Sequence, residues 1–135
     1  MKKVRTVFMG TPQIACTVLE NMIEAGIDIV LVVTQPDRKV GRKQKVTYSP
    51  VKECALHHDI PVFQPYRIKE AYQAVLDAKP ELIVTCAFGQ IVPDVILEAP
   101  IYGCVNLHGS LLPKYRGAAP IQRAIWDGEK RLACL

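Results

Sequence analysis

Short apolar runs alternate with amphipathic segments along most of this chain, and this alternation limits the folds that it can adopt. The runs at 4–9, 27–33, 61–63, 82–86 and 104–107 are typical of buried strands. The segments at 12–25, 50–58, 69–78 and 93–97 instead have helical spacing or helix-start residues. Strands that are apolar throughout and separated by helices form parallel sheets. We therefore predict an α/β fold, a mostly parallel sheet with helices on both faces.

Helix boundaries are indicated by capping residues. Thr11 is expected to cap a helix that has Pro12 in its first turn, and Gly26 is expected to end that helix. Ser49 and Pro50 are expected to start another, and a last helix is expected at 120–126. The first helix should bury one stripe, formed by Ile14, Val18 and Met22.

Composition is that of a globular protein with no membrane span. The chain has 135 residues, half of them hydrophobic, with a formal net charge of +4. The longest purely apolar run, 29–33, is far shorter than the ~20 residues that a spanning helix needs, and no signal peptide is expected. The five cysteines form no Cys-x-x-Cys pair, which argues against a disulfide framework or a zinc site. We expect reduced thiols, a cytoplasmic location, no metal, and Cys86 and Cys104 as small core residues.

One segment places chemically active side chains at a strand end. Asn106 and His108 follow the apolar run 103–105, and residues two apart in a strand point to the same face. Gly109 and Pro113 would then build a turn over the same place. An imidazole that moves a proton, beside an amide that stabilises an oxyanion, suits attack of a nitrogen on a carbonyl. The alternative is that both are satisfied turn or core residues, as such residues often are.

Three turns are expected to meet beyond the carboxyl ends of the strands, where parallel sheets bind ligands. They are 10–12, 87–90 and 106–113. The first lacks the Gly-x-Gly-x-x-Gly pattern of dinucleotide sites, and the Walker A pattern is absent, so neither a dinucleotide nor ATP is favoured.

Longer strings extend this pattern into a family resemblance. Asn-Leu-His-Gly-Ser-Leu-Leu-Pro at 106–113, with Tyr-Arg-Gly-Ala-Ala-Pro-Ile-Gln-Arg-Ala at 115–124, resembles the folate-dependent formyltransferases. The strings at 8–12, 34–38, 49–52 and 87–91 are most similar to methionyl-tRNA formyltransferases, in the same order. Glycinamide ribonucleotide formyltransferases share the Asn-x-His-x-Ser-Leu-Leu-Pro core. The resemblance implies a Rossmann-like formyltransferase fold.

The resemblance also implies roles for particular residues. Asn106 and His108 would be catalytic, and 10-formyltetrahydrofolate would be the formyl donor. Folate would contact Ser110, Leu111, Leu112 and Pro113, and the loop with Phe88, Gly89, Gln90 and Ile91 would help to form the pterin pocket. Gly10, Thr11 and Pro12 would lie on the substrate side.

The stretch 34–49 is strongly basic and is predicted to be a flexible loop. It carries Arg38, Lys39, Arg42, Lys43 and Lys45 against the single acid Asp37. A run of this kind is often no more than a solvated loop. It also suits phosphate contacts with a nucleic acid. The resemblance implies contact with the acceptor end of initiator methionyl-tRNA, with Arg38, Arg42 and Lys43 on the substrate side.

The resemblance covers only the front of the family's sequence. Residues 130–135 do not resemble the family's continuation, which supplies an acidic catalytic residue, and the carboxyl-terminal β-barrel domain is not represented. We therefore expect residues 1–135 to be a partial amino-terminal formyltransferase domain, inactive alone. The strand at 104–107 would then have one unpaired side, which predicts self-association.

Three functions remain open from the sequence. The first is formyl transfer to methionyl-tRNA in translation initiation. The second is the same chemistry on glycinamide ribonucleotide, against which the basic stretch and the string at 117–122 argue. The third is a non-catalytic fragment that binds folate or RNA.

Overall fold

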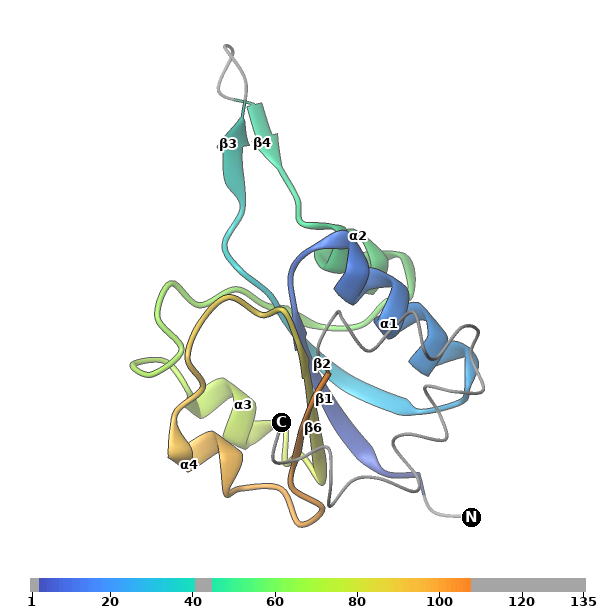
Figure 1. Cartoon of the computed structure of the whole chain (residues 1–135), viewed down its shortest axis with the longest axis vertical. Coiled ribbons are helices and arrows are strands. Elements are labelled where there is room, and N and C mark those ends of the chain that lie inside the picture. The colour runs from blue at the N-terminus through green and yellow to red at the C-terminus, as the bar shows by residue number, and fades with distance from the viewer. Residues whose placement is uncertain (1–2, 41–44, 108–135) are drawn as a thin grey trace.

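The structure is a computed structural model, which describes residues 3–40 and 45–107. Its centre is a parallel sheet in the order β5-β2-β1-β6-β7 (Figure 1). The strands are β1 (Arg5–Gly10), β2 (Asp28–Val33), β5 (Val62–Phe63), β6 (Leu82–Cys86) and β7 (Cys104–Asn106). Each expected strand is present within a residue or two of its predicted bounds, so the predicted parallel α/β architecture is confirmed.

Helices cover both faces of this sheet (Figure 1). On one face, α1 (Gln13–Glu24) and α2 (Pro50–His57) pack over a core that contains Phe8, Leu19 and Val84. On the other, α3 (Gln73–Asp77) and α4 (Asp94–Leu97) cover a second core that contains Met9, Val75 and Ile96. Alternate residues of each central strand enter opposite cores, because successive side chains of a strand point to opposite faces. That is why these strands are apolar throughout.

The chain starts in the middle of the sheet and builds outward in both directions. From β1 it proceeds to β2 and β5 on one side, and then returns to place β6 and β7 on the other side of β1. The strand order therefore reverses between β1 and β6, whose neighbours run from Thr6–Leu82 to Gly10–Cys86. Such a switch point leaves a crevice at the carboxyl ends of the two strands.

Several local predictions are wrong. Thr11 does not cap α1: the N-cap is Pro12, and no side chain caps the helix. Ile14 is 37% exposed, whereas Val18 and Met22 are buried as expected. The helix expected at 69–78 is shorter than predicted: only Gln73–Asp77 form α3. Of the two cysteines expected in the core, Cys86 is fully buried and Cys104 is half-buried. The helix expected at 120–126 lies outside the described residues.

The basic stretch is a hairpin where a loop was predicted. β3 (Arg38–Val40) pairs antiparallel with β4 (Lys45–Thr47), and the two strands form a separate sheet that projects from the body of the molecule (Figure 1). The strands were not predicted from the sequence because the segment is rich in charged and turn-forming residues. Within 38–47, only Val40 and Val46 are apolar.

In the described ranges, β7 pairs with β6 along one side and borders no other strand. The self-association predicted for this edge stays a prediction. Among these same residues, no helix combines the length and the apolar character that crossing a membrane requires.

The start of α2 confirms its sequence signal and ties the helix to the sheet. The Ser49 hydroxyl accepts a hydrogen bond from the Lys52 amide at 3.1 Å, and Pro50 occupies the first turn. The same hydroxyl lies 2.9 Å from that of Thr34, a fully buried residue directly after β2. Ser49 is thus an N-cap and also the partner of a buried polar group.

Replacing Ser49 by Ala should lower the free energy of unfolding by about 1–2 kcal/mol, because the change removes the cap and a partner of the buried Thr34 hydroxyl. Urea unfolding measures this. The matched control is Thr17→Ala, which removes an exposed hydroxyl that donates to the Gln13 carbonyl within α1. It should change stability by less than about 0.5 kcal/mol. Equal effects of the two variants would contradict this role of Ser49.

Candidate active site

The loops after β1, β2 and β6 meet at the switch point through one hydroxyl. The Thr11 hydroxyl donates to the Phe88 carbonyl at 2.8 Å and accepts from the Gln35 amide at 3.4 Å. Thr11 follows β1, Gln35 lies just beyond β2, and Phe88 lies just beyond β6. Two of the three turns that were expected to converge, 10–12 and 87–90, therefore do so, and the loop after β2 joins them.

Gly10 lets the backbone turn closely against β6. A Cβ on this residue would lie 2.7 Å from the Cys86 carbonyl oxygen and 2.7 Å from the Ala15 Cβ. Real side chains do not approach backbone so closely. The absent side chain therefore allows the first turn of α1 to lie directly against the end of β6.

Gln90 connects three loop segments through its side-chain amide. Its nitrogen donates to the Gln35 Oε1 at 2.6 Å and to the Pro65 carbonyl at 2.9 Å, while its oxygen accepts from the Ile68 amide at 2.7 Å. Gly89 beside it has a positive φ of 97°, and a Cβ there would lie 2.6 Å from the Gln35 Nε2. The loop that was expected to form the pterin pocket is thus held in place by paired amides.

Asn106 lies at the end of β7, directly opposite Thr85 of β6. The Thr85 hydroxyl, which is 8% exposed, donates to the Asn106 Oδ1 at 3.0 Å. Val105 and Leu107 on either side of it enter the core beneath α1 and α2, so Asn106 faces the opposite side of the sheet. The same side chain also carries an NH2 group, and a donor of this kind is what an oxyanion requires.

An ion pair and a cation–π contact hold the base of the projecting hairpin in place. Lys52 of α2 pairs with Asp37, just before β3, at 2.9 Å, and its ammonium lies 3.7 Å from the centre of the Tyr48 ring, just after β4. Gln64 donates to the other Asp37 oxygen at 2.7 Å. The hydrogen bond from Lys52 lowers the pKa of Asp37, and that from Gln64 does so further, although burial opposes both. Both sides of the hairpin are therefore held to one residue of α2.

The structure brings some of the predicted site residues together at the switch point and leaves others apart from it or outside the described ranges. Gly10, Thr11, Phe88, Gly89 and Gln90 meet at the switch point. Pro12 caps α1 beside them, and Asn106 ends β7. Phe88 packs its ring into the core, while Ile91 is 90% exposed. Arg38 is exposed on the hairpin. The other predicted residues lie outside the described ranges: Arg42, Lys43, His108, Ser110, Leu111, Leu112 and Pro113.

Gln35, Gln64 and Thr85 were not singled out from the sequence, although each contacts a predicted site residue or the hairpin base. Their sequence signal is positional. Gln35 and Gln64 lie within two residues of the carboxyl ends of β2 and β5, and Thr85 is a polar residue inside an apolar strand. Polar residues at these positions of a parallel sheet line the ligand edge.

Comparison with known proteins defines the class. The formyl transferase family profile matches residues 2–134, and the chain belongs to this family. Methionyl-tRNA formyltransferase of Bacillus thuringiensis subsp. konkukian is 58% identical over 130 residues, and that of Bacillus cereus is 57% identical. Each match covers 95% of this chain and 41% of the relative, so the chain spans about two fifths of the length of these proteins.

Solved structures show the same fold. Phosphoribosylglycinamide formyltransferase of Coxiella burnetii aligns with a TM-score of 0.57 at 23% identity, over 94% of this chain and 61% of that one. Glycinamide ribonucleotide transformylase of Geobacillus kaustophilus aligns with a TM-score of 0.59 at 18% identity, over 94% and 69%. At these identities the likeness concerns the fold, and it confirms the predicted Rossmann-like formyltransferase architecture.

Gln90→Glu should destabilise the loops at the switch point. A carboxylate still accepts from the Ile68 amide, but it cannot donate to Gln35 or Pro65. It also places a negative charge beside the Gln35 Oε1 and the Pro65 carbonyl oxygen. We expect a loss of about 1–3 kcal/mol in urea unfolding. Gln73→Glu is the matched control, because the Gln73 amide donates to Asp77 at 2.9 Å on the exposed face of α3. If Gln73→Glu proves as costly as Gln90→Glu, the network at Gln90 has no special role.

Proposed function

We propose that this chain provides the amino-terminal part of a methionyl-tRNA formyltransferase. The reaction moves the formyl group of 10-formyltetrahydrofolate to the amino group of initiator methionyl-tRNA. The observation that carries the proposal is the 58% identity over 130 residues to a methionyl-tRNA formyltransferase. Glycinamide ribonucleotide enzymes share the fold at 23% identity or less among the neighbours described above. The proposed location is the cytoplasm, where translation starts.

The proposed chemistry is attack of the methionyl amine on the formyl carbon. A C–N bond to the amine forms, and the C–N bond to the folate nitrogen breaks. Asn106 would donate from its NH2 group to the carbonyl oxygen as that oxygen gains charge. His108 would take the proton from the amine and return one to the folate nitrogen, a role for which an imidazole pKa near ~6.5 is suited. The loop 88–91 and residues 110–113 would hold the folate.

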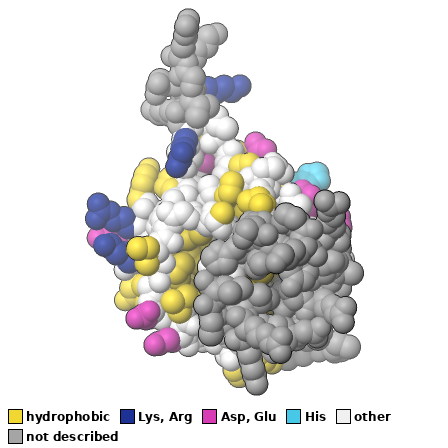
Figure 2. Space-filling view, viewed as in Figure 1, with side chains coloured by type: hydrophobic (Ala, Val, Ile, Leu, Met, Phe, Trp, Pro, Cys, Tyr) yellow, Lys and Arg dark blue, Asp and Glu magenta, His cyan; other side chains and the backbone are white. Residues whose placement is uncertain are grey.

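The exposed hairpin is the proposed contact for the nucleic acid. Two of its basic residues, Arg38 and Lys45, are exposed, and Figure 2 shows Lys and Arg side chains on the projecting arm. Lys52 fixes the base of the hairpin to α2, and the arm projects from there beyond the body of the molecule (Figure 1). Phosphates are bound there by charge, and bases need not be read.

A chimaera tests the catalytic part of the proposal. Residues 1–130 would replace the matching segment of the Bacillus cereus relative, and formylation would be measured with methionyl-tRNA and with glycinamide ribonucleotide. We expect activity with methionyl-tRNA only, while the 135-residue chain alone turns over neither acceptor. Asn106→Ala and His108→Ala should each lower turnover by roughly 10²-fold or more, and Thr17→Ala should not.

The outcomes of this assay separate the alternatives. Preference for glycinamide ribonucleotide would reject the proposed acceptor. Near-normal turnover by the His108→Ala chimaera would reject the catalytic assignment. Substantial activity in the 135-residue chain, together with a monomer that persists on dilution in analytical ultracentrifugation, would reject both the expected inactivity and the expected self-association.

Replacing Arg42, Lys43 and Lys45 by Ala in the chimaera should raise KM for methionyl-tRNA and leave KM for the folate unchanged. The difference from the parent should shrink as salt is added, because phosphate contacts release counterions. The charge-matched control replaces Lys3, Arg67 and Lys69, which are exposed elsewhere. An equal rise in KM with the control would mean that only net charge matters, and a changed folate KM would assign the hairpin to another task.

A further inference from the structure

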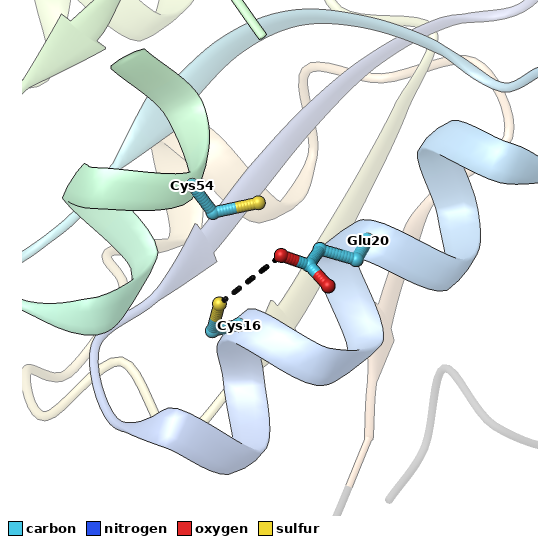
Figure 3. Close-up of side chains that lie close together, drawn as sticks. All are labelled: Cys16, Glu20 and Cys54. Atoms are coloured by element: carbon cyan, nitrogen blue, oxygen red, sulfur yellow. Dashed lines mark hydrogen bonds between the residues drawn. The ribbon is translucent and has the colours of Figure 1, made fainter. Parts of the chain in front are cut away.

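Helices α1 and α2 bring a pair of thiols and a carboxylate together where they pack against each other. Cys16 belongs to α1, Glu20 follows it by one turn on the same helix, and Cys54 belongs to α2. One sulfur or oxygen atom from each residue lies within 4.8 Å of the others. Figure 3 shows the three side chains directed into the same space between the helices. The Cys16 thiol donates to the Glu20 Oε1 at 3.9 Å.

In this cluster both cysteines are buried, whereas the glutamate is exposed. Cys16 is 7% exposed and Cys54 is 5% exposed, and both belong to the core beneath α1 and α2. Glu20 is exposed. A small ion could therefore enter past the carboxylate, and water could occupy a further position on it.

The surroundings are suited to a cation. Burial raises the pKa of both thiols, that of Cys54 to about 12, and the Glu20 carboxylate raises them further. Glu53 on α2 acts on Cys16 in the same direction. Without a metal, the thiols therefore keep their protons at neutral pH. A divalent ion would reverse the balance, because it stabilises the thiolates and is attracted by the same carboxylates.

We propose that Cys16, Glu20 and Cys54 bind one divalent cation of the zinc class, with two sulfurs and one oxygen as ligands and a water in the fourth position. Thiolate ligands select soft or borderline ions such as Zn²⁺ and Cd²⁺ over Mg²⁺ or Ca²⁺. Each ion that binds displaces two thiol protons, whereas the Glu20 carboxylate is already ionised. The ion would join α1 to α2, and this role does not depend on the proposed formyl transfer.

Sequence spacing argued against a zinc site, because no Cys-x-x-Cys pair is present. The two thiols come instead from separate helices that pack together only in the fold. Burial of two cysteines alone would be ordinary core packing. The third donor, which reaches both sulfurs from one turn along α1, is what distinguishes this cluster from such packing.

Cadmium titration of the reduced 135-residue chain tests the site, since thiolate-to-Cd²⁺ charge transfer absorbs in the ultraviolet. We expect one equivalent to bind, and Zn²⁺ to displace it in competition with a chromophoric chelator. Protons compete with the ion, so affinity should fall as pH falls, by up to about a hundredfold per pH unit below both thiol pKa values. Bound metal should also raise the urea midpoint.

Variants assign the ligands. Cys16→Ser and Cys54→Ser should each abolish the absorption that one equivalent of Cd²⁺ produces. Glu20→Gln should weaken Cd²⁺ binding by roughly tenfold or more. Cys104→Ala, which removes a half-buried thiol of β7 that packs against the second core, should leave it unchanged. Glu20 is exposed, so its variant remains informative even where a serine variant fails to fold.

Several results would overturn the proposal. These are no stoichiometric binding by the reduced chain, binding that survives in Cys54→Ser, or binding that is unchanged in Glu20→Gln. A chain that closes a disulfide between Cys16 and Cys54 in air, yet binds no cadmium when reduced, would also overturn it and would identify the two thiols as a redox pair.

Discussion

The close approach of Gly10 to the end of β6 is the constraint on which the rest of this structure depends. The backbone leaves β1 at a point where a Cβ would overlap both the Cys86 carbonyl and Ala15. Because it can turn there, α1 begins at once and packs against the sheet, and the Thr11 hydroxyl comes within reach of Phe88. The start of α1 and the meeting of the loops after β1 and β6 both follow from this single turn.

The amides around the switch point have a further physical meaning. Gln35 and Gln90 are neutral. The Gln90 amide both donates and accepts, and the Gln35 oxygen accepts from it, so several loops are held together without introducing a charge. A folate pterin is itself a flat ring with donors and acceptors at its edge. Amides that pair with one another in this way could exchange partners with such a ring without the cost of desolvating a charge.

Much of this arrangement was predictable from the sequence, for identifiable reasons. The strands are apolar throughout, and Ser49 and Pro50 mark a helix start directly, so the sheet and α2 were predicted closely. Thr11 carries an equally good capping signal, but its hydroxyl donates to the Phe88 carbonyl instead. This is a tertiary contact that the local sequence does not reveal. The hairpin was missed because its strands are largely charged, and the Cys16–Cys54 cluster because its members are distant in sequence.

The hairpin and the sheet are connected through the first turn of α2. Lys52, which holds both sides of the hairpin, lies in the same helical turn that Ser49 caps. The arm is therefore tied to one turn of an eight-residue helix, and Gln64, directly after β5, provides a second attachment at Asp37. End turns of helices open at a much lower free energy than central strands. The attachment of the basic arm to the body of the molecule is therefore less resistant to local opening than the central strands of the sheet.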